Sequence, residues 1–186
     1  MLLAHLLLVN AFAAVPAMIP SEAPSFVVPG TTMTYTVDMN GNTKTMVVTL
    51  KQVTGDLVFD WSMGEGMEGS RTITEADRAS ARAQDNYFAN GETGAHPGTS
   101  TVFLSSVQMD DIAKSGKTAA TIDGREVVLK YKGTESMDIA TGESSGIFYV
   151  WKLVGKGVSI NVFGNPMFPA IMEQDVGFHV KIDRIN

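Results

Sequence analysis

The pentapeptide Gly142-Glu143-Ser144-Ser145-Gly146 fits the G-x-S-x-G pattern that carries the nucleophile of many serine hydrolases. That chemistry needs a strand before the serine, a helix after it, and an acid and a histidine to complete the triad. Asp175 and His179 follow in the hydrolase order, but residues 147–151 predict a strand where the helix should stand. The pattern therefore favours a hairpin loop, and a serine hydrolase using Ser144 and His179 is a remote alternative.

Other residues that could bind a phosphate or a metal ion lack the spacing that such a site requires. Residues 115–118 are similar to the end of a phosphate-binding loop, but Asp111 stands where that loop needs a glycine. Neither His96 nor His179 has a partner at the spacing of a metal-binding pair. The acidic residues at 65, 68, 110 and 111 lack the ordered spacing of a calcium loop and indicate solvated turns. We expect no catalytic residue, no metal site and no cofactor.

The amino-acid composition excludes further classes of function. The chain has 186 residues, with 14 basic and 20 acidic side chains and a formal net charge of −6. That balance argues against a nucleic-acid partner. Hydrophobic residues make up 44 % and charged residues 18 %, which is typical of a folded domain and excludes a fully disordered chain. There is no cysteine, so disulfides and thiol chemistry are excluded.

Residues 1–17 are typical of a secretory signal peptide, with an apolar run too short to span a bilayer. Small residues place the predicted cleavage after Ala13, Ala14 or Ala17. No Lys or Arg precedes this apolar run, although signal peptides usually have one there, so the true start codon could lie upstream. The alternative interpretation of residues 1–17 is a buried N-terminal helix. We expect a linker over residues 18–29 and a single β-rich domain over residues 30–186. The expected location is secreted or periplasmic, with no transmembrane segment in the mature chain.

Turn and strand signals dominate the rest of the chain. Residues 34–39, 44–53 and 57–63 alternate or are rich in β-branched residues, and Asn40-Gly41 and Asp123-Gly124 are strong hairpin signals. One convincing helix is predicted to begin after Thr74, with an apolar stripe that extends to Tyr87. Residues 64–69 predict a flexible loop, residues 101–104 a short strand, and residues 107–112 a helical turn. The fold class that follows is mainly β: a curved antiparallel sheet or incomplete β-barrel with one short α-helix.

Two stretches carry a family resemblance. Phe103-Leu104-Ser105 followed by residues 109–112 and 114–118 resembles a segment of uncharacterised secreted bacterial β-rich domains. Gly164-Asn165-Pro166, with the apolar run and alternating strand after it, resembles the C-terminus of the same group, the TapB-like family. Phe168-Pro169 departs from it where an uninterrupted strand is expected. The resemblance covers about a third of the chain. It implies a curved antiparallel sheet and no established activity.

The apolar residues are the most informative feature for function. Residues 163–172 form an apolar run broken by Pro166 and Pro169, which argues against a helix and a central strand. Such a loop covers the core, covers a cavity or meets a partner. The candidate ligand-binding residues are Phe59, Trp61, Phe148, Trp151, Phe163, Met167, Phe168 and Met172.

We expect a non-catalytic binding module for an apolar small molecule such as a lipid or an acyl chain. The alternative is a structural or protein-interaction domain of the cell envelope, which binds a protein partner through an exposed edge strand or the same loop.

Overall fold

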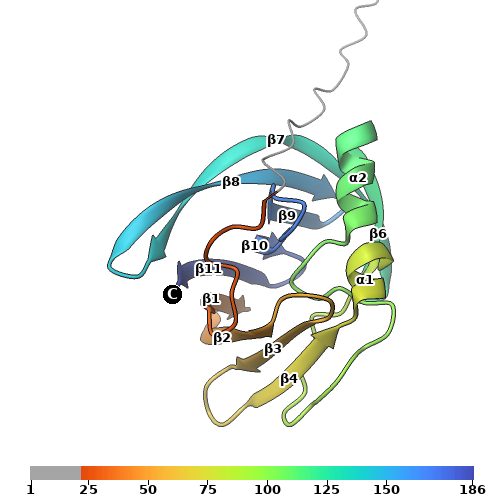
Figure 1. Cartoon of the computed structure of the whole chain (residues 1–186). Coiled ribbons are helices and arrows are strands. Elements are labelled where there is room, and N and C mark those ends of the chain that lie inside the picture. Colours follow the sequence, from red (N-terminus) through yellow and green to blue (C-terminus); the bar gives the residue numbers. More distant parts are fainter. Residues whose placement is uncertain (1–21) are drawn as a thin grey trace, which may run out of the picture.

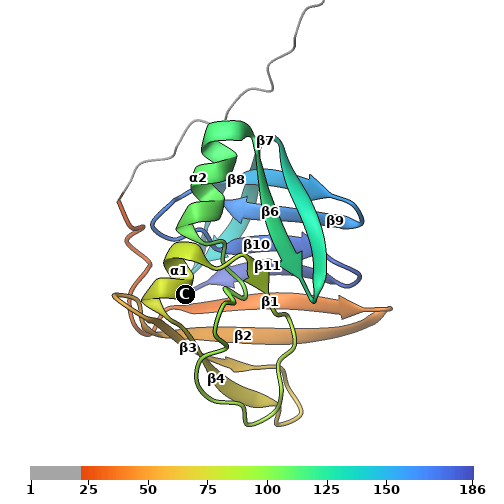
Figure 2. The same cartoon turned by 90° about the vertical axis from the view of Figure 1, so that its right-hand side faces the viewer.

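The computed structural model describes residues 22–186, so the predicted signal peptide and the first residues of the predicted linker lie outside the described part. One sheet of eleven strands carries two helices (Figures 1 and 2). The order in the sheet is β4-β3-β2-β1-β11-β10-β9-β8-β7-β6-β5. The strands are β1 (Thr32–Met39), β2 (Asn42–Gln52), β3 (Leu57–Ser62), β4 (Glu68–Ile73), β5 (Ala83–Gln84), β6 (Lys117–Ile122), β7 (Arg125–Thr141), β8 (Ser144–Gly155), β9 (Val158–Phe163), β10 (Ile171–Asp175) and β11 (His179–Ile185). The mainly β prediction is confirmed.

Local sequence signals explain both predicted hairpins. Asn40 and Gly41 adopt φ values of 56° and 82° between β1 and β2, and Asp123 and Gly124 adopt 48° and 77° between β6 and β7. Positive φ at both central residues gives a turn whose twist matches that of the paired strands. In β1 to β3 every second residue is buried, as the alternating pattern predicts.

The helices differ from the prediction in length and number. Thr74 caps α1 (Glu75–Ser80) as expected, since its side chain accepts a hydrogen bond from the Asp77 N–H. The helix stops at Ser80, because the next residues form β5 and pair with the end of β6. Tyr87, expected on the apolar stripe, is 76 % exposed. A second helix, α2 (Ser106–Ser115), begins with a capping box between Ser105 and Gln108 where only a helical turn was predicted.

Three further segments depart from the sequence prediction. Residues 64–69 were expected to form a loop, but β4 begins at Glu68 and pairs with β3. The apolar run 163–172 contains the end of β9 and the start of β10, and the two prolines lie in the loop between them. A strand was expected at 101–104, where only Phe103 forms a bridge, with Ala170.

The long strand β7 closes part of the sheet on itself. It pairs with β6 at its start and with β8 along most of its length, and a bulge at residues 131–133 bends it. Its last residues, Ala140 and Thr141, then pair with Arg184 and Ile185 of β11 in parallel. Strands β7 to β11 thus form a ring of five strands joined at one end. The β7–β8 hairpin is a long curved arm whose tip returns to the end of β11 (Figure 1).

Apolar side chains gather in two buried clusters. The first cluster contains the buried side chains of β1 to β3 and those of Ile139, Phe148, Val150 and Phe163 on β7 to β9. The second cluster lies between α2 and strands β6 to β9. Both helices lie on the same side of the sheet (Figure 2). Within residues 22–186, neither helix is long and apolar enough to cross a membrane.

Candidate functional site

The predicted ligand-binding residues are mostly core residues that do not converge on one cavity. Phe59, Trp61, Phe148, Phe163, Phe168 and Met172 are buried in the first cluster, and Trp151 is buried in the second. Met167 differs from the others, because it is 50 % exposed. The structure therefore divides the predicted set between two cores and one surface position.

The apolar loop between β9 and β10 packs onto filled space. Phe26, in the predicted linker, lies edge-on to Phe148 and Phe168 with ring centroids 5.7 and 6.2 Å apart. Phe168 also lies 4.9 Å from Phe103. The hollow beside this loop, lined in part by Met167 and Phe168, has a volume of about 30 Å³, which suits a single water and not an acyl chain. The loop is a lid over packed core.

The ring of five strands is also filled. Even eight strands enclose an interior only wide enough for side chains or one small ligand. On strands β7 to β9 of this ring, Ile139, Phe148, Val150 and Phe163 are buried in the first cluster, and the Phe148 and Phe163 ring centroids lie 5.7 Å apart. These side chains belong to the packed core.

Ser144 and His179 lie at opposite ends of β11. Ser144 is paired with Thr141 across the β7–β8 turn and donates its hydroxyl proton to the Thr141 carbonyl oxygen at 3.1 Å. Thr141 is paired with Ile185, six residues from His179, which is about 20 Å along an extended strand. His179 Nε2 lies 3.5 Å from a Glu173 carboxylate oxygen. The structure does not bring the serine and the histidine together.

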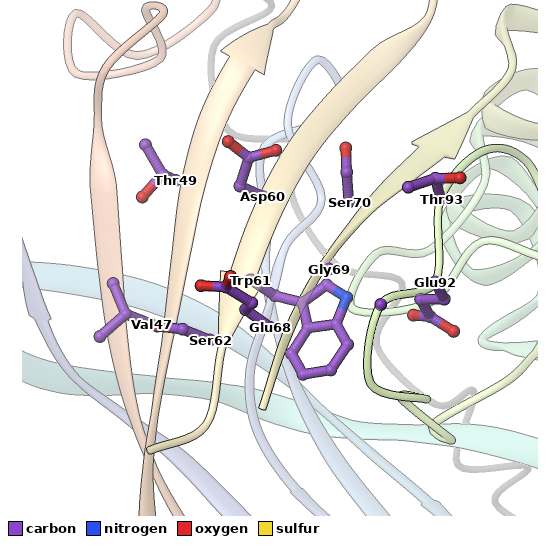
Figure 3. Close-up of a pocket in the computed structure, with 11 residues that line it drawn as sticks. Val47, Thr49, Asp60, Trp61, Ser62, Glu68, Gly69, Ser70, Glu92 and Thr93 are labelled. Carbon is purple, nitrogen blue, oxygen red and sulfur yellow. The ribbon is translucent and has the colours of Figure 1, made fainter. Parts of the chain in front are cut away.

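A hydrophilic hollow of about 440 Å³ lies on the outer face of β2 to β4 (Figure 3). The strand register sets side chains in two cross-strand rows, Thr49–Asp60–Ser70 and Val47–Ser62–Glu68. The Lys51 ammonium lies 3.3 Å from the Asp60 carboxylate. Trp61 borders the hollow beside Gly69 but is buried, so its ring offers no open stacking face. These groups can form hydrogen bonds with a polar molecule and offer little to an apolar one.

Sequence reasoning missed a buried charged cluster centred on Arg71. Its side chain is 1 % exposed, and it donates to both Glu92 carboxylate oxygens at 2.9 and 3.1 Å. It also donates to the Asp85 and Tyr87 carbonyl oxygens. In the structure Arg71 faces inward with Ile73, because side chains alternate along β4. The sequence predicted no strand here and gave no sign of the partners of Arg71.

His96 and Asp85 extend this cluster towards solvent. His96 Nδ1 lies 3.0 Å from the Asp85 carboxylate. Burial acts to raise the pKa of Asp85, but the Tyr87 N–H, the His96 hydrogen bond and the Arg71 charge together lower it. A carboxylate held ionised in this way suits a structural ion pair rather than a general acid. The cluster fastens the segment 85–101 to β4.

The arm carries the most exposed apolar surface near a strand edge. Ile147 and Tyr149 of β8 are 69 % and 56 % exposed. They stand directly opposite Asp138 and Ser136 of β7. The loop with Met167 lies beside them, because the Gly164 N–H donates to the Tyr149 carbonyl oxygen at 3.3 Å. Within the described chain, no strand pairs with residues 132–139 of β7 on the side away from β8.

Comparison with known proteins adds no assignment. Among residues 22–186, no group of three or more His, Asp or Glu side chains could hold a metal ion. No protein-family model, curated protein or solved structure matches this chain. The resemblance to TapB-like domains therefore rests on the motifs alone and stays a prediction.

Proposed function

We propose that this protein is a non-catalytic interaction domain that acts outside the cytoplasm and binds a protein partner through the β7–β8 arm. The observation that carries the proposal is the free edge of β7 next to exposed apolar side chains. A strand edge with unpaired backbone groups can accept an extended segment as an additional strand. The filled ring and the small hollow under the apolar loop favour this function over a carrier of acyl chains in the sheet interior.

The partner is an extended peptide segment with apolar side chains on one face. Added beside β7, its side chains would stand next to Ser136 and Asp138, with Tyr149 and Ile147 one strand further. Backbone hydrogen bonds would supply affinity, and the exposed apolar residues would select the sequence. The signal-like residues 1–17 support a location outside the cytoplasm.

A photo-crosslinking experiment tests this function. A benzoyl-phenylalanine replaces Tyr149 in the full chain in its host, and Tyr87, which is more exposed but lies in a loop, serves as the matched site. We expect a discrete protein adduct from position 149 and none from position 87. A second change, Ile147→Glu, should abolish the adduct, whereas Met39→Glu at the end of β1 should not.

Hydrogen exchange of the complex then locates the contact. The outward-facing amides of residues 132–139 should become protected when the captured partner is bound. Absence of any adduct specific to position 149, or protection confined to other strands, would refute the proposal.

A further inference from the structure

Four lysines gather at the end of the sheet formed by β6 to β9. Lys117 lies on β6, Lys130 and Lys132 lie on β7, and Lys156 lies in the turn between β8 and β9. All four are exposed, and none forms an ion pair with another residue of the described range 22–186. The whole chain has a net charge of −6, so this positive surface is a local feature.

The strand register places two of these charges against each other. Lys117 stands directly opposite Lys130 in the β6–β7 hairpin. Like charges at directly opposed positions destabilise an antiparallel pair. The fold itself gains nothing from this arrangement, whereas an anion bound between the ammonium groups would relieve the repulsion.

Three of these lysines border a hollow that is also lined by valines. Lys130, Lys132 and Lys156 line a volume of about 440 Å³ together with Val127, Val128 and Val154. Val128 is 51 % exposed in spite of its apolar side chain. A single acidic residue, Glu126, lines this hollow.

A second hollow adjoins the first and continues its character. It has a volume of about 390 Å³, shares Glu126, Val127 and Lys156 with the first, and adds Arg125 together with the buried side chains of Ile122 and Val158. We call the two hollows together the lysine–valine groove. It places cations beside a track of branched apolar side chains.

We propose that the lysine–valine groove binds a single-chain anionic amphiphile. The carboxylate or phosphate head lies on Lys130 and Lys132, and the alkyl chain lies over Val128 and Val154, which line the same hollow. Ammonium groups that form no ion pair within residues 22–186 supply the charge, and the apolar side chains add affinity that a plain inorganic anion cannot gain. This site lies at the other end of β8 from Ile147 and Tyr149, so it is independent of the proposed function.

Calorimetry of the full chain with decanoate, kept monomeric, tests the proposal. Decyltrimethylammonium has the same chain with the opposite charge, and acetate has the head without the chain. We expect saturable binding of decanoate alone, weakened by added salt. Amide NMR shifts on titration should be confined to residues 126–132 and 154–158.

Two matched double variants test whether Lys130 and Lys132 bind the anionic head. Lys130→Gln/Lys132→Gln should weaken decanoate binding about tenfold or more. Lys181→Gln/Arg184→Gln removes two exposed cations of β11 that likewise have no ion pair within residues 22–186, and it should leave the affinity unchanged. Val128→Ser should also weaken binding, and thermal unfolding checks that each variant is folded.

Several outcomes would overturn the inference. An equal loss of decanoate affinity in both double variants would mean that binding depends only on the overall charge of the protein. Equal binding of decyltrimethylammonium would reduce it to apolar adsorption, and equal binding of acetate would reduce it to a simple anion site. Binding to phosphatidylglycerol vesicles without binding to monomeric decanoate would assign the lysines to a membrane surface instead.

Discussion

Replacing Arg71 by methionine tests whether the buried charged cluster holds the segment 85–101 in place. The change keeps an apolar stem and removes the guanidinium that pairs with both Glu92 oxygens. Glu92, whose side chain is 10 % exposed, would then be a buried charge without its partner. The carbonyl oxygens of Asp85 and Tyr87 would lose a donor as well.

The expected cost follows from that loss. Removing one member of a buried ion pair typically costs about 3–5 kcal/mol, so Arg71→Met should lower the free energy of unfolding by about 4 kcal/mol. Because domains of this size are stable by only about 5–15 kcal/mol, this is a large fraction of the total. Arg71→Lys, which keeps the charge but loses the planar fork, should cost less.

Urea unfolding followed by tryptophan fluorescence measures the free energy. Chymotrypsin digestion should show faster cleavage near Tyr87 and Phe88 in Arg71→Met, since Arg71 also packs 4.3 Å from the Phe88 ring centroid. Arg71→Met/Glu92→Leu removes both charges and should be more stable than Arg71→Met alone.

The control is Lys51→Met, which breaks the half-exposed pair with Asp60 and should cost at most about 1 kcal/mol. A cost below about 1 kcal/mol for Arg71→Met, with unchanged proteolysis, would refute the role assigned to the cluster.

Three further substitutions test the packing and the electrostatics. Gly69→Ala should cost about 1–3 kcal/mol by urea unfolding, because a Cβ there would lie 2.8 Å from both Trp61 Nε1 and the Glu92 carbonyl oxygen; a neutral result would mean that β4 shifts freely. Phe26→Ala should cost about 2 kcal/mol through its lost ring contacts, whereas Val28→Ala, at an exposed position, should be nearly neutral; equal effects would show that the contacts of Phe26 with Phe148 and Phe168 do not stabilise the fold. Asp85→Asn should destabilise the protein above the ordinary Asp pKa of 3.8 and progressively less as pH falls through the lower folded pKa, because the folded state holds that pKa down; a constant difference from pH 2 to pH 7 would contradict this.

Much of the sheet could be predicted from the sequence because its signals are local. Positive-φ turns at Asn40-Gly41 and Asp123-Gly124 and period-two burial in β1 to β3 depend on neighbours a few residues apart. The hairpin at Asp123-Gly124 even implies that Lys117 faces Lys130. Ile122 and Arg125 pair on either side of the turn, Lys117 lies five residues before Ile122, and Lys130 lies five residues after Arg125. That signal was in the sequence and was missed.

The tertiary structure decided what depends on distant segments. The helix after Thr74 ends at Ser80 because β5 pairs with β6, about 40 residues later. Arg71 is buried because Glu92 and the carbonyl oxygens of a long loop surround it. Phe148 and Phe163 belong to the first core cluster, in a sheet that folds back on itself because β7 bends at its bulge and meets β11. Contacts between residues far apart in the sequence determine these features, and no local sequence pattern predicts such contacts.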